Sequence, residues 1–338
     1  MSDIVLINPY YSQKKEYYSF NLPAAPLGLT YLAGYLRRFG LASKIVELGV
    51  FDIKQAILLK DRVRFGISDK KILKILQKER PKIVGITSMY SVYYRDVIEI
   101  AQTIKKFNRK IKVVIGGNHA SSYWNFVLKD KNIDFVVIGE GEQTFLELCQ
   151  VILKRKKNYE NIKGIAFNKK GEVIRTPVRE LISNLDDIPF PARDLVVFEK
   201  YLATPQHNPY LMRYPSATLI TSRGCPGKCV YCTVRAVWGR TWRGRNPQNV
   251  VDEIEELVKK YGVREIAPLD DSASVNKKRW NAICDELISR KLDIKWSTPN
   301  GIAHWTLDKP TIKKMYEAGC YRITFGIESG NTLPHTFF

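Results

Sequence analysis

Residues 221–232 read Thr-Ser-Arg-Gly-Cys-Pro-Gly-Lys-Cys-Val-Tyr-Cys. Cys225, Cys229 and Cys232 lie close together in this stretch, with three residues between the first pair and two between the second. Three thiolates can bind three irons of a four-iron, four-sulfur cluster and leave the fourth iron open to bind and activate a small molecule. The spacing therefore predicts a [4Fe-4S] site on a loop of this chain.

A structural zinc site is the alternative for three clustered cysteines. Such sites use four ligands at characteristic spacings, and no fourth ligand lies at such a spacing here, since His207 is remote. The remaining cysteines, Cys149, Cys284 and Cys320, fall on apolar helix faces or at element ends, so we expect them in the core. We therefore favour the iron–sulfur cluster.

The cysteine loop stands at the start of a repeating β/α pattern. A strand at 217–221 leads directly into the loop, and three further strands at 264–269, 293–298 and 321–330 alternate with helical apolar spacing at 248–260, 277–290 and 309–318. Polar residues gather at the strand ends, as in barrel enzymes. Only four strands are visible and Pro334 interrupts the tail, so we expect the first four β/α units of a chain truncated at its C-terminus.

The first half of the chain alternates apolar runs with helical patterns. The runs lie at 3–8, 43–48, 82–88, 112–117 and 134–140, and the helical patterns at 26–38, 70–77, 92–106 and 142–153. Continuously apolar strands between helices predict an α/β fold with a doubly wound parallel sheet. Gly116 and Gly117 end one strand at the carboxyl edge, where open α/β sheets bind ligands, although glycines also end strands for geometric reasons.

The middle of the chain has a different character. Residues 165–175 predict a hairpin around Lys-Lys-Gly, and the Pro-rich segment 185–195 reads as an extended linker. We therefore expect three parts: a sheet domain over 1–150, a hairpin and linker over 151–215, and a β/α barrel region over 216–338.

The composition of the chain limits which partners and which cellular compartment we expect. The chain has 54 Lys and Arg against 34 Asp and Glu, a formal net charge of +20, which indicates either an anionic partner or solvated basic faces. No run of 18 apolar residues or signal-peptide pattern is present, so we expect a cytoplasmic protein with reduced cysteines and no transmembrane segment. One tighter basic and aromatic cluster follows the cysteines and could bind substrate or cofactor or simply form a structured loop: Arg235, Trp238, Arg240, Trp242, Arg243 and Arg245.

Five segments of the first 150 residues resemble the cobalamin-binding domain that precedes the catalytic barrel in one large class of radical S-adenosylmethionine (SAM) enzymes. They follow the family's order: Asn8-Pro9-Tyr10 and residues 26–33, 84–88, 116–119 and 138–145. The resemblance implies that this domain binds cobalamin. The alternative is a retained sheet that binds nothing.

The resemblance also assigns cobalamin contacts. Ser88, Gly116 and Gly117 would line the pocket for the nucleotide tail, and residues near Tyr90 would face the lower side of the corrin. The alternatives are a strand-end hydroxyl for Ser88 and a packed aromatic for Tyr90. None of the four histidines has an aspartate two residues before it, as the Asp-x-His-x-x-Gly motif requires, so we expect no histidine ligand on cobalt.

The cysteine spacing is similar to that of the radical SAM superfamily itself. By this resemblance Tyr231, just before the last cysteine, would contact the adenine of SAM, and Asp270-Asp271 would lie near its methionyl amino group. Gly326-Ile-Glu-Ser-Gly330 resembles the fourth-strand motif near the ribose, which makes Glu328 and Ser329 candidates as well. Asp271 and Glu328 could instead be surface carboxylates or salt-bridge partners.

The two resemblances together imply a cobalamin-dependent radical SAM enzyme. It would cleave SAM reductively at the cluster to form a 5′-deoxyadenosyl radical, for methyl transfer to an unactivated carbon or a related radical reaction. Its expected partners are a small-molecule or lipid-like substrate and an electron donor of the flavodoxin or ferredoxin type.

Two alternatives remain. One is a truncated or inactive fragment that only binds cobalamin. The other is a tRNA-modifying radical SAM enzyme, but the methylthiolating family needs three extra cysteines in its N-terminal domain, where this chain has only Cys149. We therefore do not expect nucleic acid as a partner.

Overall fold

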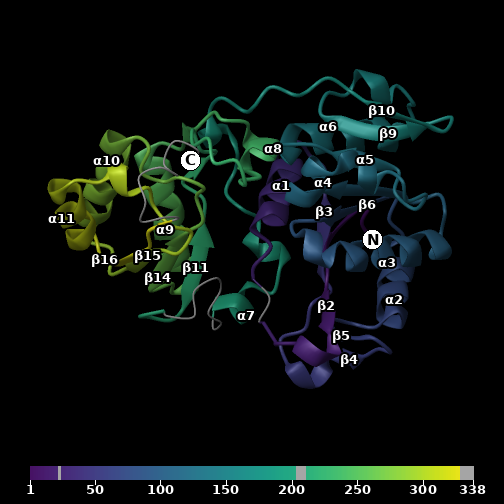
Figure 1. Ribbon diagram of the computed structural model, residues 1–338, viewed down its shortest axis with the longest axis horizontal. Coiled ribbons are helices and arrows are strands. Elements are labelled where there is room, and N and C mark those ends of the chain that lie inside the picture. The colour runs from purple at the N-terminus through teal and green to yellow at the C-terminus, as the bar shows by residue number, and fades with distance from the viewer. Residues whose placement is uncertain (22–23, 203–210, 328–338) are drawn as a thin grey trace. The chain divides into compact units, whose positions relative to one another are not determined.

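The computed structural model describes residues 1–21, 24–202 and 211–327 (Figure 1). The chain divides into two compact units. The first unit comprises Met1–Leu181 and Pro191–Val196, and the second comprises Ile182–Phe190 and Val197–Phe338. The Pro-rich segment expected as a linker is thus shared between the two units.

The first unit is built on a seven-stranded sheet in the order β10-β9-β8-β7-β6-β1-β3. The strands are β1 (Ile4–Asn8), β3 (Ser43–Glu47), β6 (Ile83–Thr87), β7 (Lys112–Gly116), β8 (Phe135–Val137), β9 (Ile165–Lys169) and β10 (Glu172–Arg175). The run β3-β1-β6-β7-β8 is parallel throughout. This is the doubly wound order in which ligands bind at the switch point, here between the carboxyl ends of β1 and β6. The expected sheet is confirmed.

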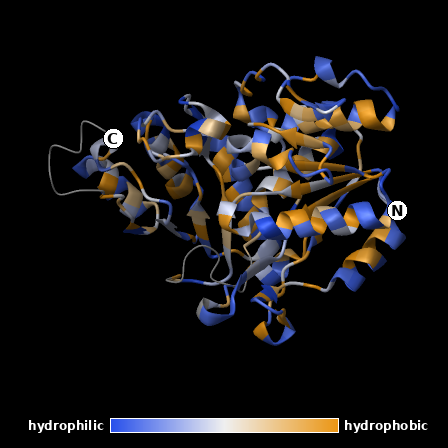
Figure 2. Cartoon of the chain, turned by 45° about the vertical axis from the view of Figure 1, so that its right-hand side comes forward, coloured by the Kyte–Doolittle hydropathy of each residue, from blue (hydrophilic) through white to orange (hydrophobic). Residues whose placement is uncertain are grey.

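Helices cover both faces of this sheet, which explains why its central strands are apolar on both sides. Two helices, α1 (Leu27–Arg38) and α6 (Gly141–Leu153), pack on one face. On the other face lie α2 (Asp69–Glu79), α3 (Tyr94–Phe107), α4 (Asn118–Ser122) and α5 (Trp124–Val127). In Figure 2 the strands are almost wholly hydrophobic, whereas the helices show one hydrophobic and one hydrophilic side.

The expected hairpin exists, but it belongs to the first unit's sheet. Strands β9 and β10 pair antiparallel, and β9 also pairs antiparallel with β8. It therefore extends one edge of the sheet rather than standing between domains.

A second, small sheet in the first unit was not expected from the sequence. It has the order β2-β5-β4, with β2 (Tyr11–Lys14), β5 (Arg62–Phe65) and β4 (Ile57–Leu58). Because β2 starts three residues after β1 ends, this sheet, which we call the arm, leaves the main sheet at its carboxyl edge. Its own core contains Val50, Val63 and Phe65.

The second unit has a four-stranded parallel sheet in sequential order: β11 (Ser216–Leu219), β14 (Glu265–Pro268), β15 (Lys295–Thr298) and β16 (Cys320–Ile323). Crossover helices α9 (Pro247–Tyr261), α10 (Lys277–Ser289) and α11 (Lys309–Glu317) connect them. The side chain of Asn246 caps α9, and Gly262 ends it in the left-handed conformation. These are the four expected β/α strands. Residues 328–338 lie outside the described residues.

Shorter elements complete the chain. They are α7 (Phe198–Leu202), α8 (Val234–Trp238), the strand pair β12 (Ser222–Arg223) and β13 (Arg243–Gly244), and 3-10 turns at Lys15–Tyr17, Ile53–Gln55, Ser91–Tyr93, Tyr159–Asn161, Leu185–Asp187, Arg193–Leu195 and His304–Thr306. None of the described helices combines the length and the apolar character needed to cross a membrane.

Candidate cofactor-binding sites

The loop that carries the three cysteines is closed at its base by a short strand pair. Strands β12 and β13 pair antiparallel, with Ser222 opposite Gly244 and Arg223 opposite Arg243. Gly224 follows with φ +88°, and a Cβ there would lie 2.2 Å from the carbonyl oxygen of Thr241. Only glycine fits this close approach, so the loop requires glycine at residue 224, directly before Cys225.

Asp270 follows the carboxyl end of β14 and binds the residues that follow the neighbouring strand β11. Its carboxylate accepts hydrogen bonds from the Thr221 N–H at 2.7 Å and from the hydroxyls of Thr221 and Ser222, both at 2.5 Å. The residue is 3% exposed, and burial raises the pKa of its carboxyl group. These three hydrogen bonds of Asp270 therefore all go to the segment that leads into the cysteine loop.

Asp271, the next residue, is exposed. One of its carboxylate oxygens accepts a hydrogen bond from the Gly224 N–H at 3.2 Å. The paired aspartates thus differ: Asp270 is buried beneath the loop, whereas Asp271 lies at its surface beside the residue that precedes Cys225.

The cysteines themselves are free thiols and half-buried. Gly227 lies beside two of them, because a Cβ at this residue would be 3.2 Å from Cys225 Sγ and 3.8 Å from Cys229 Sγ. Its N–H donates to Cys225 Sγ at 3.4 Å. Hydrogen bonds of this kind to cysteine sulfur tune the potential of iron–sulfur clusters.

The three cysteines offer three half-buried sulfurs on one loop. Among the described residues, no group of three His, Cys, Asp or Glu side chains is placed to hold a single metal ion. The thiolates of a four-iron cluster bind different irons, so three of them can serve such a cluster. They remain a prediction as cluster ligands.

The other three cysteines behave as core residues. Cys149, Cys284 and Cys320 are buried. Burial raises the pKa of Cys149 and raises the pKa values of Cys284 and Cys320 to about 12, which keeps all three protonated.

Much of the basic and aromatic cluster after the cysteines is structural. Arg243 donates to the carbonyl oxygen of Ile182 at 2.6 Å, and buried Arg245 pairs with the fully buried Glu253. Arg279, from α10, donates to the carbonyl oxygen of Arg245 at 2.5 Å, and burial lowers its pKa to about 10. These guanidinium groups secure the base of the loop.

The two tryptophans of this cluster also pack in the loop. The Trp242 indole donates to the carbonyl oxygen of Ser272 at 2.7 Å, and Arg223 lies over the ring of Trp238 at 5.1 Å. Of the four arginines, Arg235 and Arg240 are exposed and remain candidates for ligand contacts.

Of the remaining predicted SAM contacts, the structure describes Tyr231 but not Glu328 or Ser329. Tyr231 is 56% exposed on the loop, next to Cys232, so its ring is accessible. Glu328 and Ser329 lie outside the described residues. Their assignment stays a prediction.

In the first unit, the predicted cobalamin residues gather at the carboxyl ends of β6 and β7. The Ser88 N–H donates to the carbonyl oxygen of Gly116 at 2.6 Å. Gly117 has φ +108°, and a Cβ there would lie 2.7 Å from the Ser88 carbonyl oxygen. By contrast, a Cβ on Gly116 would meet only Val137, at 3.9 Å. Gly117 is therefore required by the backbone, whereas Gly116 leaves space for an approaching group.

His119, at the start of α4, is a further candidate for a cobalamin contact, although its sequence context does not predict it as a cobalt ligand. Its Nδ1 shares a hydrogen bond with Ser91 Oγ at 2.8 Å, and its ring lies between Tyr94 and Tyr123 at 4.5 and 5.1 Å. Burial lowers its pKa, so the imidazole is neutral at pH 7. Its place three residues after Gly116, at a strand's carboxyl end, is the sequence signal for it.

Two buried polar atoms at this edge have no hydrogen-bond partner among the described residues: Ser88 Oγ and His119 Nε2. Ser88 is only 1% exposed. Buried polar groups in proteins are nearly always paired, so these two atoms can hydrogen-bond with a polar ligand or with water at this edge. The residues at this edge therefore fit a ligand with hydrogen-bonding groups, such as cobalamin.

Tyr90 lies on the segment that leaves β6 and is 60% exposed. Its ring makes an edge contact with Tyr93, with centroids 6.1 Å apart. Tyr90 is thus held by Tyr93 on one side, while most of its surface is exposed to solvent.

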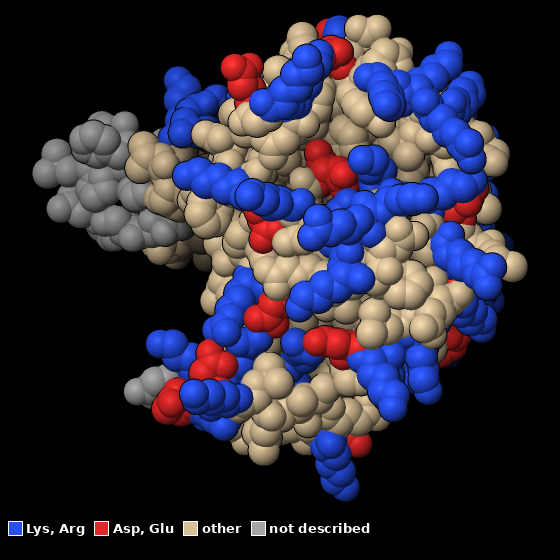
Figure 3. Space-filling model, turned by 90° about the vertical axis from the view of Figure 1, so that its right-hand side faces the viewer, with Lys and Arg blue, Asp and Glu red and all other residues tan. Residues whose placement is uncertain are grey.

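A hollow of about 860 Å³ lies at the opposite, amino edge of the same sheet, near the starts of β7 and β8. Six lysines line it with two acids, Asp134 and Glu160, which are paired with Lys112 and Lys169. Figure 3 shows basic side chains spread over one whole face of the molecule, with acidic ones between them. This distribution favours solvated basic faces over one dedicated anionic site.

Two family models match the chain: a B12 binding domain over residues 19–149 and the radical SAM superfamily over residues 219–336. The chain thus carries a B12 binding domain followed by a radical SAM domain. The matched ranges contain both candidate sites, with the cysteine loop in the second and the edge formed by β6 and β7 in the first.

Two relatives are named as methyltransferases. An uncharacterized methyltransferase of Pyrococcus horikoshii is 35% identical, over 90% of this chain and 61% of the relative. Cytidylyl-2-hydroxyethylphosphonate methyltransferase of Streptomyces wedmorensis is 31% identical, over 97% of this chain and 65% of the relative.

A solved structure shares the fold. The methyltransferase TsrM of Kitasatospora setae, with cobalamin and a [4Fe-4S] cluster bound, matches with a TM-score of 0.71 at 18% identity, over 95% of this chain and 60% of that one. This radical SAM chain therefore spans about three fifths of the length of the proteins that it matches.

Proposed function

We propose that this chain holds a [4Fe-4S] cluster, SAM and cobalamin, and that it cleaves SAM reductively to a 5′-deoxyadenosyl radical. The radical would serve methyl transfer to an unactivated carbon of a small-molecule or lipid-like substrate. The observation that carries the proposal is the presence in one chain of the half-buried cysteine loop and of a sheet edge with two unpaired buried polar atoms. The two methyltransferase relatives support methyl transfer.

The cysteine loop would hold the cluster. Cys225, Cys229 and Cys232 supply three thiolates, and the Gly227 N–H stabilises the charge on Cys225 Sγ. When bound, a cluster with one open iron supplies the electron that breaks a carbon–sulfur bond of SAM. Asp270 keeps the end of β11 in place beneath the loop, so it acts in this proposal as a positioning residue.

Contacts to SAM would come from accessible groups around this loop. Tyr231 offers an exposed ring for the adenine, and Asp271 offers an exposed carboxylate for the methionyl amino group. Glu328 and Ser329 are proposed near the ribose from the resemblance of residues 326–330 alone.

The carboxyl edge of the first unit would hold cobalamin. Ser88 and His119 supply hydrogen-bonding groups, and Gly116 allows the ligand to approach the backbone. His119 already shares its Nδ1 with Ser91 and keeps a neutral ring between two tyrosines, which suits a hydrogen-bonding role rather than cobalt ligation. Tyr90 would face the lower side of the corrin.

The electron that the cluster needs would come from an external donor of the flavodoxin or ferredoxin type. Such donors and reduced thiols are found in the cytoplasm, where we propose that the protein works.

Anaerobic reconstitution with iron and sulfide tests the proposal. The chain should take up about four irons, whereas Cys229→Ala should lose the cluster absorbance and Cys149→Ala should keep it. With dithionite as reductant, the reconstituted chain should release 5′-deoxyadenosine from SAM. Saturable hydroxocobalamin binding without any cleavage of SAM would instead support a cobalamin-binding fragment.

A further inference from the structure

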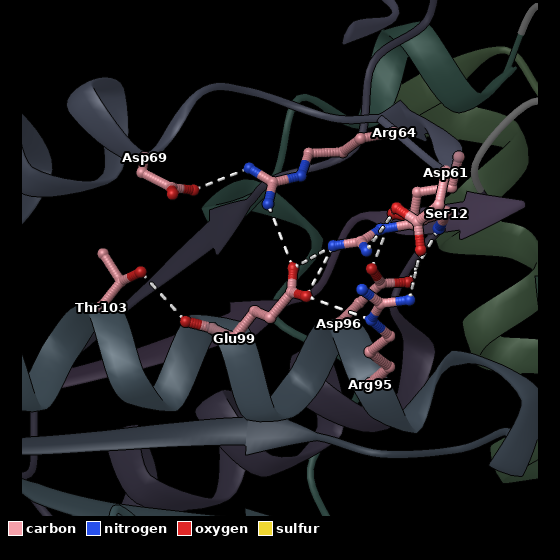
Figure 4. A network of polar contacts seen from close by, with 9 residues as sticks. Ser12, Asp61, Arg64, Asp69, Arg95, Asp96, Glu99 and Thr103 are labelled. Atoms are coloured by element: carbon pink, nitrogen blue, oxygen red, sulfur yellow. Dashed lines mark hydrogen bonds and ion pairs between the residues drawn. The ribbon is translucent and has the colours of Figure 1, made fainter. Parts of the chain in front are cut away.

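The arm of the first unit is anchored to helix α3 by a buried network of charges (Figure 4). Arg62, on β5, donates to both carboxylate oxygens of Glu99 at 2.5 and 2.6 Å, and Arg64 reaches the same carboxylate at 3.2 Å. From β2, the N–H and hydroxyl of Ser12 donate to buried Asp96 at 2.8 and 2.7 Å. Charge-assisted and bidentate hydrogen bonds of this kind fix orientation as well as adding stability.

A row of aromatic rings runs from the arm to the carboxyl edge of the main sheet. Tyr11, on β2, stacks on Phe65 at 4.9 Å and contacts Tyr93 at 5.3 Å. Tyr93 in turn contacts Tyr90 at 6.1 Å in an edge geometry. The row therefore links the core of the arm to the exposed ring of Tyr90 through successive pairs, each within the usual range for aromatic contacts.

The charge network and the row of aromatic rings both hold the part of the chain around the start of α3. Residues 88–93 connect β6 to α3. Asp96 and Glu99 bind the start of α3 to the arm, and Tyr11 contacts Tyr93 at the end of the connection. Tyr90 contacts Tyr93, and Tyr93 contacts Tyr11, so the arm is linked to Tyr90 through one intermediate ring.

We propose that the arm is a positioning element for cobalamin, and that Tyr11 holds Tyr90 in the orientation that supports the corrin. This inference rests on the proposed cobalamin site and extends it to residues that are distant in sequence and belong to another sheet. Tyr11 acts through Tyr93 and Tyr90, so it is a positioning residue.

The Tyr11 side chain allows the ring and the hydroxyl to be separated. Its hydroxyl exchanges hydrogen bonds with the backbone of Asn21 at 2.7 and 2.8 Å, away from the row. Tyr11→Phe keeps the ring pairs and loses only these bonds, whereas Tyr11→Leu removes the ring. Tyr159→Leu is a matched control, since Tyr159 contacts Phe135 at 4.8 Å beside the hollow at the opposite edge of the same sheet.

The test measures equilibrium binding of hydroxocobalamin to the full chain and the electron paramagnetic resonance spectrum of bound cob(II)alamin. Tyr11→Leu should weaken binding roughly threefold to tenfold, the factor that corresponds to losing one aromatic pair, and should change the cobalt spectrum. Tyr11→Phe and Tyr159→Leu should bind within about twofold of the parent, with the parent's spectrum.

Circular dichroism shows whether each variant is folded. If Tyr11→Leu does not fold, Tyr93→Leu breaks the row at its half-buried middle ring and should show the same loss. Parent-like affinity and spectrum in a folded variant that lacks either ring would overturn the inference. Failure of the parent chain to bind hydroxocobalamin would instead contradict the proposed function.

Discussion

At the residue scale, the six cysteines separate into two groups by burial. The thiolate is the reactive form, and burial raises the pKa values of Cys284 and Cys320 to about 12, whereas the loop cysteines are half-buried. Iodoacetamide at pH 8 should therefore alkylate Cys225, Cys229 and Cys232 in the cluster-free protein and spare the other three. Peptide mass spectrometry reads the sites. Early modification of Cys284 in the folded chain would contradict this division.

His119 gives the first unit a predictable dependence on pH. Burial lowers its folded pKa below the unfolded value of about 6.5, so between these two values the unfolded chain binds more protons. The part of the stability due to His119 is complete above about pH 6.5 and is lost as the pH falls toward the folded pKa.

Urea unfolding at pH 7.5 and 5.5 checks this effect. The parent should lose more free energy of unfolding on acidification than His119→Gln, which cannot titrate. Equal losses in the two proteins would show that His119 titrates normally.

Gly116 tests whether the ligand approaches the backbone. A Cβ there meets only Val137, at 3.9 Å, so Gly116→Ala should fold with parent-like stability. Hydroxocobalamin binding should nevertheless weaken roughly tenfold or more if the ligand uses that space. Gly171→Ala, in the β9–β10 turn, is a control for lost stability: nothing lies within 4 Å of its Cβ, but its φ of +92° strains alanine, so this variant should be less stable yet bind hydroxocobalamin like the parent. Unchanged binding by Gly116→Ala would remove this residue from the site.

Residue types and spacing were enough to predict the cysteines but not the roles of the polar residues around them. Asp270 and Asp271 are neighbours of the same type, yet one is buried beneath β11 and the other is exposed. The difference arises from which strand end lies opposite each carboxylate, and a single sequence does not contain that information.

At the element scale, Asp270 joins β14 to the end of β11. It accepts three hydrogen bonds, and asparagine would turn an N–H₂ group toward at least one of the donors. Asp270→Asn should lower the free energy of unfolding by about 1–3 kcal/mol, the usual cost of an unpaired buried donor. Asp271→Asn keeps an amide oxygen that can accept the Gly224 N–H, so it should lower the free energy of unfolding less than Asp270→Asn does. Urea unfolding measures both, and equal effects would contradict the assigned roles.

The regular elements were predictable because each carries its own periodic signal. Most main strands and helices lie within a few residues of their expected limits, as for α3 at Tyr94–Phe107 against 92–106, but the last strand, expected at 321–330, is shorter and spans Cys320–Ile323. The arm was not predictable because β2, β4 and β5 have four residues or fewer, and β2 pairs with β5 about 50 residues further along the chain. No short window of sequence contains that pairing; only the β4–β5 pair is local.

At the scale of the whole molecule, the order of the two units was predictable, but the limits of the first were not. The hairpin β9–β10 reads as a local feature in the sequence, yet it pairs with β8 and completes the first sheet. Hairpin formation is local, whereas the choice of a neighbouring sheet edge is tertiary.

The central claim is that the three cysteines hold a cluster with one iron open to SAM. Electron paramagnetic resonance of the anaerobically reconstituted, dithionite-reduced chain, with and without SAM, tests it most directly. The reduced chain should show a [4Fe-4S] signal that SAM shifts, and the Cys225→Ala, Cys229→Ala and Cys232→Ala variants should show no such signal. A cluster signal that survives these substitutions, or one that SAM leaves unchanged, would contradict it.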